Sequence, residues 1–316
     1  MRWCCPYLPL LLLLSFLLLF VGRATVSGVR ICSYNVQKMS PKKLANYRVT
    51  HTLTRVVSRC DICLLQDVID PTGKAVKALL ASLNRGTDRY DESYYQSVSS
   101  RGLGNSPDDM QQYVFLYRTQ AVQLTGQYQY KSNNKFVRDP FVVQFQSNKT
   151  DIKEFILVPL HSDPLKAVQE IDQLYEVFKE VSTKWNNTNV MLLGDFHAAC
   201  AYMTRSDKKN IRLFTISDFS WLIGDRVDTT VKGIVNCAYD RIVVYGQPFL
   251  KAIEPFSAQV FDFGKEFKLP RTRVLEVSDH FPVEVMLKSS ALLLQATPIL
   301  ILLSASVFVQ SFLSSL

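Results

Sequence analysis

Residues 155–195, FILVPLHSDPLKAVQEIDQLYEVFKEVSTKWNNTNVMLLGD, decide the fold class. The stretch begins and ends with short apolar runs rich in Ile, Val and Leu, which are typical of strands. Between these runs, apolar residues recur at helical spacing and predict a helix with one buried stripe. The stripe consists of Leu165, Val168, Ile171, Leu174, Tyr175, Phe178 and Val181. Strands that alternate with a helix in this way favour an α/β fold.

The same pattern recurs along the chain. Further strands are predicted at residues 29–34, 62–65, 113–117, 141–145, 242–245 and 281–287, and further helices at 43–59 and 73–84. Residues 29–288 contain no linker or repeat, and their length of about 260 residues suits one large domain. We therefore expect a single α/β domain in this region.

Four of the predicted strands end in polar residues that a core strand does not need. These are Asn35, Gln66-Asp67, His161 and Asp195. Each alone could be an ordinary strand-exit turn or helix cap. Four together, with Asp279-His280 at the start of another strand, indicate a site. If neighbouring strands run parallel, these residues gather along one rim, where open α/β sheets bind ligands.

The histidines point to the chemistry of this rim. Three of the 4 histidines lie in short motifs with a strand or a carboxylate beside them: Val158-Pro159-Leu160-His161, Leu193-Gly194-Asp195-Phe196-His197 and Ser278-Asp279-His280-Phe281-Pro282. Imidazoles beside carboxylates move protons at neutral pH, and a further carboxylate can hold a hard cation. This combination predicts metal-assisted hydrolysis of a phosphodiester.

The two ends of the chain predict passage through the secretory pathway. Residues 1–28 have the pattern of a signal peptide, and an N-terminal membrane anchor is the alternative. Residues 289–316 start with small residues and continue without a charge, as in a removable signal for a glycosylphosphatidylinositol anchor. A retained membrane helix is the rival interpretation. We expect the protein at the cell surface or in the lumen of an endomembrane compartment.

The charge balance favours a polyanionic partner. The chain has 36 Lys and Arg against 28 Asp and Glu, a formal net charge of +8. Such a balance favours encounter with nucleic acid or anionic lipid, although a merely soluble basic surface has the same composition.

The cysteines and sequons agree with secretion. Removal of residues 1–28 leaves Cys32, Cys60, Cys63, Cys200 and Cys237, an odd number, so at least one thiol stays free. Cys200 and Cys237 are the preferred disulfide because both lie in polar, loop-like segments. Cys32 and Cys63 lie in apolar strands and are expected to be buried thiols. The Cys60-Asp61-Ile62-Cys63 pattern is weak evidence for a metal or redox site without a second pair. Asn148 and Asn186 begin glycosylation sequons.

Seven motifs, spread over nearly all of residues 29–288, together resemble the deoxyribonuclease I family. They are Asn35, Leu65-Gln66-Asp67-Val68, Arg138-Asp139-Pro140, Val158-Pro159-Leu160-His161, Leu193-Gly194-Asp195-Phe196, Asn236-Cys237-Ala238-Tyr239-Asp240-Arg241 and Ser278-Asp279-His280-Phe281-Pro282. With its apolar C-terminal tail, the chain looks most similar to the deoxyribonuclease I-like 1 branch.

The resemblance implies a four-layer α/β sandwich of two packed mixed β-sheets flanked by helices. It also implies a monomer that cleaves DNA to 5'-phosphate ends with Mg²⁺ or Mn²⁺ and with Ca²⁺ support, and a disulfide between Cys200 and Cys237. In the implied site, His161 and His280 transfer protons and Asp240 supports His280. The other implied roles are metal binding by Asp67, Asp195 and Asp279, phosphate contact by Asn35, Arg138 and Tyr239, and structural calcium at Asp228.

Three residues depart from the family pattern. Asp67 is one methylene shorter than the family's glutamate, and near-octahedral Mg²⁺ tolerates little misplacement. Gln111 replaces the glutamate that the family pairs with His161, so the pKa of His161 is expected to fall unless Asp108 or Asp109 substitutes. His197 replaces an asparagine and could contact phosphate or a softer ion such as Zn²⁺ or Mn²⁺.

These departures leave two interpretations open. The first is an active endodeoxyribonuclease, which the retained histidines and carboxylates favour. The second is a catalytically weakened relative that binds DNA or a protein partner through the same cleft. A lipid or inositol phosphatase is disfavoured by the secretory signal and by Cys200 and Cys237.

Overall fold

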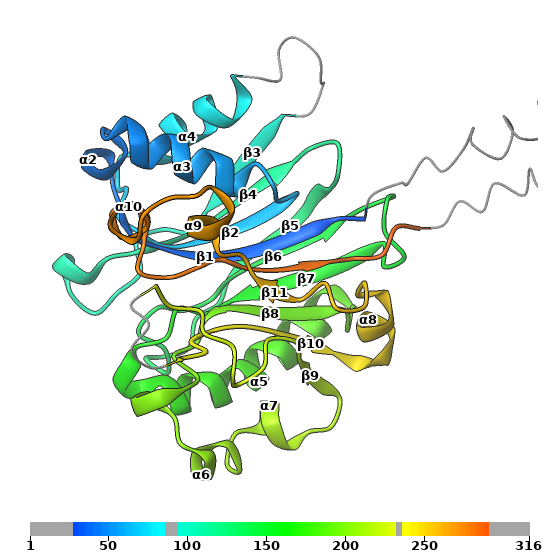
Figure 1. Ribbon diagram of the computed structural model, residues 1–316. Helices are drawn as coiled ribbons and strands as arrows, with labels where there is room; N and C mark the ends of the chain where they lie inside the picture. Colours follow the sequence, from blue (N-terminus) through cyan, green and yellow to red (C-terminus); the bar gives the residue numbers. More distant parts are fainter. Residues whose placement is uncertain (1–27, 86–93, 232–235, 291–316) are drawn as a thin grey trace, which may run out of the picture.

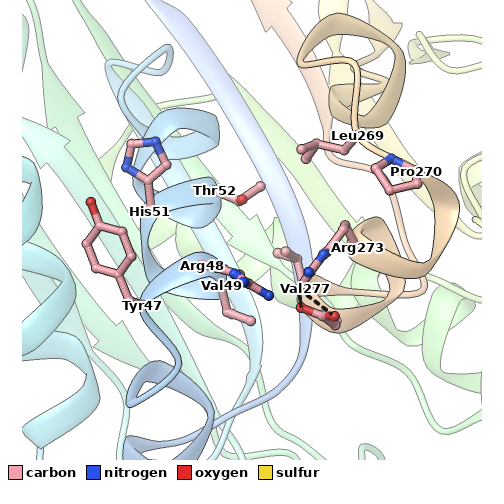
Figure 2. Close-up of a pocket in the computed structure, with 10 residues that line it drawn as sticks. Tyr47, Arg48, Val49, His51, Thr52, Leu269, Pro270, Arg273 and Val277 are labelled. Atoms are coloured by element: carbon pink, nitrogen blue, oxygen red, sulfur yellow. Dashed lines mark hydrogen bonds and ion pairs between the residues drawn. The ribbon is translucent and has the colours of Figure 1, made fainter.

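Two six-stranded mixed sheets pack face to face and carry helices on their outer faces (Figure 1). This arrangement is seen in a computed structural model, which describes residues 28–85, 94–231 and 236–290. The expected four-layer α/β sandwich is thereby confirmed.

The first sheet has the strand order β11-β12-β1-β2-β4-β3. Its strands are β1 (Arg30–Met39), β2 (Ile62–Val68), β3 (Tyr95–Ser99), β4 (Gln112–Arg118), β11 (Gln259–Val260) and β12 (Val283–Met286). Only β1 and β2 run parallel among these pairs. The carboxyl ends of β1 and β2 therefore lie at the same edge of the sheet.

The second sheet has the order β5-β6-β7-β8-β10-β9. Its strands are β5 (Gln123–Gln129), β6 (Phe141–Gln146), β7 (Glu154–Pro159), β8 (Val190–Asp195), β9 (Phe219–Trp221) and β10 (Asp240–Tyr245). Here β7 and β8 form the one parallel pair. Each sheet thus contributes one parallel pair to the molecule.

The central strands contain continuous apolar runs because both of their faces are buried. In β2, Ile62 and Leu64 face the core between the two sheets. Cys63 and Leu65 of the same strand face the helices outside the first sheet. Successive side chains of the strand therefore face two different apolar environments, and the sequence shows a continuous apolar run instead of alternating polar and apolar residues.

The longer helices lie on the two outer faces (Figure 1), whereas α8 (Gly246–Ala252) packs Phe249 into the core between the sheets. Leu53 of α3 (Tyr47–Val57), Leu79 of α4 (Lys74–Asn84) and Val274 of α10 (Arg271–Val277) pack with the first sheet. The predicted stripe of α5 (Ala167–Trp185), including Ile171, packs on the second sheet together with α7 (Arg212–Thr215). Shorter helices are α2 (Pro41–Leu44), α6 (Arg205–Lys208), α8 (Gly246–Ala252) and α9 (Phe263–Glu266).

All eight predicted strands occur, but the single helix predicted at residues 43–59 was wrong. The structure divides this segment into α2 and α3. The side chain of Asn46 accepts a hydrogen bond from the backbone N–H of Arg48 and so caps a new helix. The strands that the sequence did not predict are β3, β5, β9 and β11, which are the four sheet edges. Edge strands are short or polar and lack the apolar run of a central strand.

The cysteine predictions were partly right. The Cys200–Cys237 disulfide is present, and Cys63 is a buried free thiol. The expected thiol at Cys32 was wrong, because Cys32 in β1 forms a disulfide with Cys60, which follows α3. These two residues meet across the layer between sheet and helix, a tertiary contact that spacing does not reveal. Since Cys60 is bonded to Cys32, Cys60 and Cys63 do not form a CxxC unit.

The predicted signal peptide and hydrophobic tail lie almost entirely in residues 1–27 and 291–316, outside the described residues. Within the described ranges, no helix has both the length and the apolar character needed to cross a membrane. The two described ends lie close together, since the backbone N–H of Leu287 donates to the carbonyl of Val29.

Candidate active site

The predicted rim exists, and both sheets build it. Asn35 and Gln66 are Cα partners at the end of the parallel β1–β2 pair. His161 follows β7, and Asp195 ends β8 in the parallel pair of the second sheet. Asp240, which begins β10, is the Cα partner of Asp195. The face-to-face packing of the sheets therefore brings residues from distant parts of the chain to one edge.

Asp195 lies at the centre of the site and is fully buried. Its Oδ2 atom lies 3.8 Å from Nε2 of His161, 3.6 Å from Nε2 of His280, and 2.9 Å from Nδ2 of Asn35, which donates to it. Its Oδ1 lies 3.4 Å from Nδ1 of His197. Burial opposes ionisation, but the three imidazoles and the Asn35 amide outweigh it and lower the pKa of Asp195.

His280 and Asp240 form the expected pair. Nδ1 of His280 lies 2.8 Å from Oδ2 of Asp240, so Nε2 of the ring is directed toward Asp195. Burial would lower the pKa of His280, but Asp240 and Asp195 outweigh that effect and raise it to about 10. The hydroxyl of Thr229 accepts a hydrogen bond from the backbone N–H of Asp240 at 3.2 Å and fixes the start of β10.

His161 lacks the carboxylate partner that the family pattern provides. Its Nδ1 atom is buried without a hydrogen-bond partner among the described residues, and the same is true of Oε1 of Gln111. The carboxylate of Asp109 instead lies 3.7 Å from Arg138, so the proposed substitute faces another residue. Burial, with Arg138 and the other two imidazoles nearby, lowers the pKa of His161 well below its usual range, as expected.

Asp67 and Arg138 have unused polar atoms that suit ligands of opposite charge. Oδ1 of Asp67 and both Nε and Nη1 of Arg138 are buried and form no hydrogen bond within the described part of the chain. A buried polar group without a partner is costly, so such atoms indicate a cation at Asp67 and an anion at Arg138. Ligand atoms of Asp195, Asp240 and His280 also lie within 4.8 Å of one another. The residues therefore fit a divalent cation and a phosphate.

His197 joins a cluster of rings beside His161 and His280. Its ring centroid is 6.0 Å from that of His161 in a stacked arrangement and 5.4 Å from that of Tyr239. The hydroxyl of Ser162 lies 3.1 Å from Nδ1 of His197. Tyr239 also lies near His280, with ring centroids 6.3 Å apart. His197 and Tyr239, two of the residues predicted to contact phosphate, thus lie at the site.

Gln66 connects the two halves of the site, a role that the sequence did not reveal. Its Nε2 donates to the carbonyl of Leu160 at 2.6 Å, and its Oε1 accepts from the backbone N–H of Asp195 at 3.0 Å. Gly194 must be glycine at this contact, because a Cβ there would lie 2.1 Å from the Leu160 carbonyl oxygen. The available signal in the sequence was a glutamine that directly follows the apolar run of β2, and the structure shows that Gln66 is fully buried.

The backbone of the rim is strained where it meets Asp67. Gln37, Lys38 and Asp67 all have positive φ angles, of 45°, 55° and 57°. Nζ of Lys43 donates to the carbonyls of Val36 and Gln37 and holds this bulge of β1. Burial lowers the pKa of Lys43 to about 8. Left-handed non-glycine residues are rare and concentrate at functional sites.

Four other predicted residues lie outside this centre. Asp279 is half-buried next to His280, and its carbonyl accepts from the backbone N–H of Val231. Oδ1 of Asp228 accepts from the backbone and hydroxyl of Thr230, which closes the proposed calcium loop. Asn148 and Asn186 are exposed, as glycosylation requires.

Known proteins are similar to this chain in sequence and in fold. The Endonuclease/Exonuclease/phosphatase family matches residues 32–280. Human deoxyribonuclease gamma is 41% identical over 88% of this chain and 92% of its own length. Human deoxyribonuclease-1-like 1 is 40% identical over 88% and 89%, and deoxyribonuclease-1 of Sus scrofa is 41% identical over 83% and 92%.

Solved structures agree at the level of the fold alone. TDP2 from C. elegans superposes with a TM-score of 0.56 at 12% identity, over 82% of this chain and 75% of that chain. The human Nocturnin catalytic domain gives 0.54 at 12% identity, over 84% and 94%. The chain belongs to the endonuclease/exonuclease/phosphatase family and, within it, to the deoxyribonuclease I family.

Proposed function

We propose that this protein is a metal-dependent endodeoxyribonuclease that hydrolyses DNA phosphodiester bonds and leaves 5'-phosphate ends. One observation carries the proposal: Nε2 of His161 and Nε2 of His280 both face Oδ2 of Asp195, at 3.8 and 3.6 Å. Two imidazoles around one carboxylate can serve the two proton transfers of phosphodiester hydrolysis. The relatives named deoxyribonucleases support DNA as the substrate.

Each residue has a role that its contacts support. Asp240 holds His280 in one tautomer, so that Nε2 can carry one of the two proton transfers of the reaction. His161 carries the other. The N–H groups of Arg138 that form no hydrogen bond within the described residues would bind the phosphate oxygens. Asp67 and Asp195 would hold Mg²⁺ or Mn²⁺, which when bound would stabilise the negative charge that grows on the phosphate, and Asp279, next to His280 in the sequence, is a further candidate ligand. The loop at Asp228 would hold Ca²⁺.

The unpartnered Nδ1 of His161 suggests that this enzyme is slower than one with the family's glutamate. A carboxylate at position 111 would accept a hydrogen bond from Nδ1 and stabilise the charged imidazole. We therefore expect Gln111→Glu to accelerate cleavage by about tenfold. Gln112→Glu is the matched control, because Gln112 donates to the carbonyl of Ser100 and not to the site.

Nicking of supercoiled plasmid by the purified protein tests the function. Mg²⁺, Mn²⁺ and Ca²⁺ are supplied singly and in combination, and the products are ligated to report 5'-phosphate ends. We expect nicking with metal, none with chelator and a large loss in His161→Ala, while His51→Ala on the exposed face of α3 changes little. Salt-sensitive DNA binding without nicking in any metal would instead favour a catalytically weakened DNA-binding relative, the second candidate.

We further propose that the protein acts in the secretory pathway and is tethered to a membrane through residues 289–316. Two disulfides and exposed sequons at Asn148 and Asn186 support an oxidising, glycosylating compartment. Phosphatidylinositol-specific phospholipase C should release the protein from intact cells. If the protein stays with the membrane, a retained helix replaces the lipid anchor in this proposal.

A further inference from the structure

Within the described residues, Tyr113 provides the one side-chain hydrogen bond to the backbone of His161, and it does so from the other sheet. The residue belongs to β4 of the first sheet, and its ring is buried in the core between the sheets. Its hydroxyl accepts a hydrogen bond from the backbone N–H of His161 at 2.9 Å. The same hydroxyl donates to the backbone carbonyl of Arg138 at 3.3 Å. One oxygen therefore joins the segments that carry His161 and Arg138.

The imidazole of His161 depends on this contact because its side chain is weakly held. Nδ1 has no hydrogen-bond partner among the described residues, and the nearest carboxylate oxygen lies 3.8 Å from Nε2. A ring without its own hydrogen bonds takes its position from packing and from its backbone. The Leu160 carbonyl is held by Gln66, and the His161 N–H is held by Tyr113.

We propose that Tyr113 is a positioning residue for catalysis, whose hydroxyl sets the placement of His161 relative to Arg138. This inference rests on the proposed function, since it assigns His161 and Arg138 to proton transfer and phosphate binding. Hydrolysis requires the proton-transferring imidazole and the bound phosphate to stay in register, and a displacement of about 1 Å can reduce a rate by about 10²-fold. Tyr113 itself does not touch the substrate.

The kinetic test compares two tyrosines of the same strand. Tyr113→Phe keeps the buried ring and removes only the bridging hydroxyl. Tyr117→Phe is the matched control, because Tyr117 is also buried in β4 but its hydroxyl bonds with the side chain of Gln96. We expect Tyr113→Phe to lower kcat for plasmid nicking by about 10- to 100-fold with a change in KM below about threefold. Tyr117→Phe should stay within about twofold of the unaltered protein.

A double-variant comparison separates positioning from a loss of fold. If Tyr113 acts through His161, Tyr113→Phe should have almost no further effect on kcat in a His161→Ala background. An equal loss in both backgrounds, or a loss no larger than that of Tyr117→Phe, would overturn the proposal. Circular dichroism establishes that each variant is folded.

Amide hydrogen exchange tests the contact without any measurement of activity. The N–H of His161 should exchange as slowly as the amides of the central strands, and it should exchange faster in Tyr113→Phe but not in Tyr117→Phe. Rapid exchange of this amide in the unaltered protein would overturn the positioning role. A protein that never nicks DNA but protects this amide would instead contradict the proposed function alone.

Discussion

Three imidazoles surround the buried carboxylate of Asp195, and the chemistry of the site depends on how each ring is held. His280 is oriented by Asp240 at 2.8 Å, whereas Nδ1 of His161 has no partner within the described residues. His197 adds a third ring, stacked on His161, where the family pattern has asparagine. The same residue type therefore occupies three different environments around one carboxylate.

Asp240→Asn removes the negative charge of the Asp240 side chain and keeps its shape, so it tests what that charge contributes to catalysis. The amide can still accept from Nδ1 of His280, but it does not stabilise the imidazolium. We expect the plasmid-nicking rate to fall by about 10² to 10⁴-fold while circular dichroism stays unchanged. Asp172→Asn, which alters an ion pair between Asp172 of α5 and Arg212 of α7, serves as the control. A rate within about threefold of the unaltered protein would show that the pair is not catalytic.

At the scale of elements, the two disulfides connect different kinds of segment. The Cys32–Cys60 bond joins β1 to the end of α3, with a sequence separation of 28. The Cys200–Cys237 bond joins two loops beside His197 and Tyr239, with a separation of 37. The first bond connects the sheet to its helical layer, and the second supports the site.

Removal of each disulfide should therefore have a different effect. Replacing both cysteines of either pair by alanine should lower the free energy of unfolding by about 3 kcal/mol, measured by urea denaturation. Only loss of Cys200–Cys237 should also reduce nicking strongly under conditions where both variants are folded. Equal losses of activity would contradict the assignment of separate roles.

The first turn of α5 contains a buried carboxylate, Glu170, that is hydrogen-bonded to two segments next to the site. Oε1 of Glu170 accepts from the backbone N–H of Val137 at 2.8 Å, and Oε2 accepts from that of Asp163 at 3.1 Å. These two segments lead to Arg138 and His161. Burial raises the pKa of Glu170 to about 7, although both backbone N–H groups oppose the shift.

This shift predicts the sign of a pH effect on stability. Because the folded pKa lies above the unfolded one, the contribution of Glu170 is fully present below about pH 4.5 and is lost as pH rises toward 7, by up to about 3 kcal/mol. Glu170→Gln removes this dependence. Urea unfolding at several pH values should show the advantage of the unaltered protein over Glu170→Gln shrinking as pH rises. An advantage that grows with pH would mean that the ionised carboxylate is the stabilised form.

At the scale of the whole molecule, the net charge of +8 should govern the encounter with DNA. Binding of a cationic protein to DNA releases counterions, so affinity falls as a power of the salt concentration. We expect the dissociation constant for plasmid DNA to rise about 10²-fold or more between about 50 and about 200 mM salt. A neutral osmolyte at matched osmolality is the control. Affinity that is independent of salt would exclude electrostatic docking as the main source of binding.

The central strands and the long helix could be predicted because their signals are local. Apolar runs mark strands buried on both faces, and the stripe through Ile171 and Leu174 marks α5. The four edge strands could not be predicted, since strands such as β5 contain few apolar residues and many polar ones. The Cys32–Cys60 disulfide was missed because the residues meet only after β1 and α3 have packed.

The residues of the site could be predicted better than their connections. Asn35, His161, Asp195, Asp240 and His280 were each identified by position at a strand end or by family motif, and the structure brings all five together. The roles of Gln66, Tyr113 and Glu170 in holding them were not predicted. Their contacts reach from one sheet or helix to the backbone of another, and no spacing along the chain encodes such a contact.

The amino-acid order alone determined the fold class, the central strands and the reactive side chains, because periodicity and strand-end chemistry act over a few residues. Tertiary packing decided that the ends of the two parallel strand pairs, one from each sheet, meet at Asp195. It also decided that Asp109 pairs with Arg138 while Nδ1 of His161 stays unpartnered. These outcomes depend on distances between residues far apart in the chain, and such distances exist only once the two sheets have packed together.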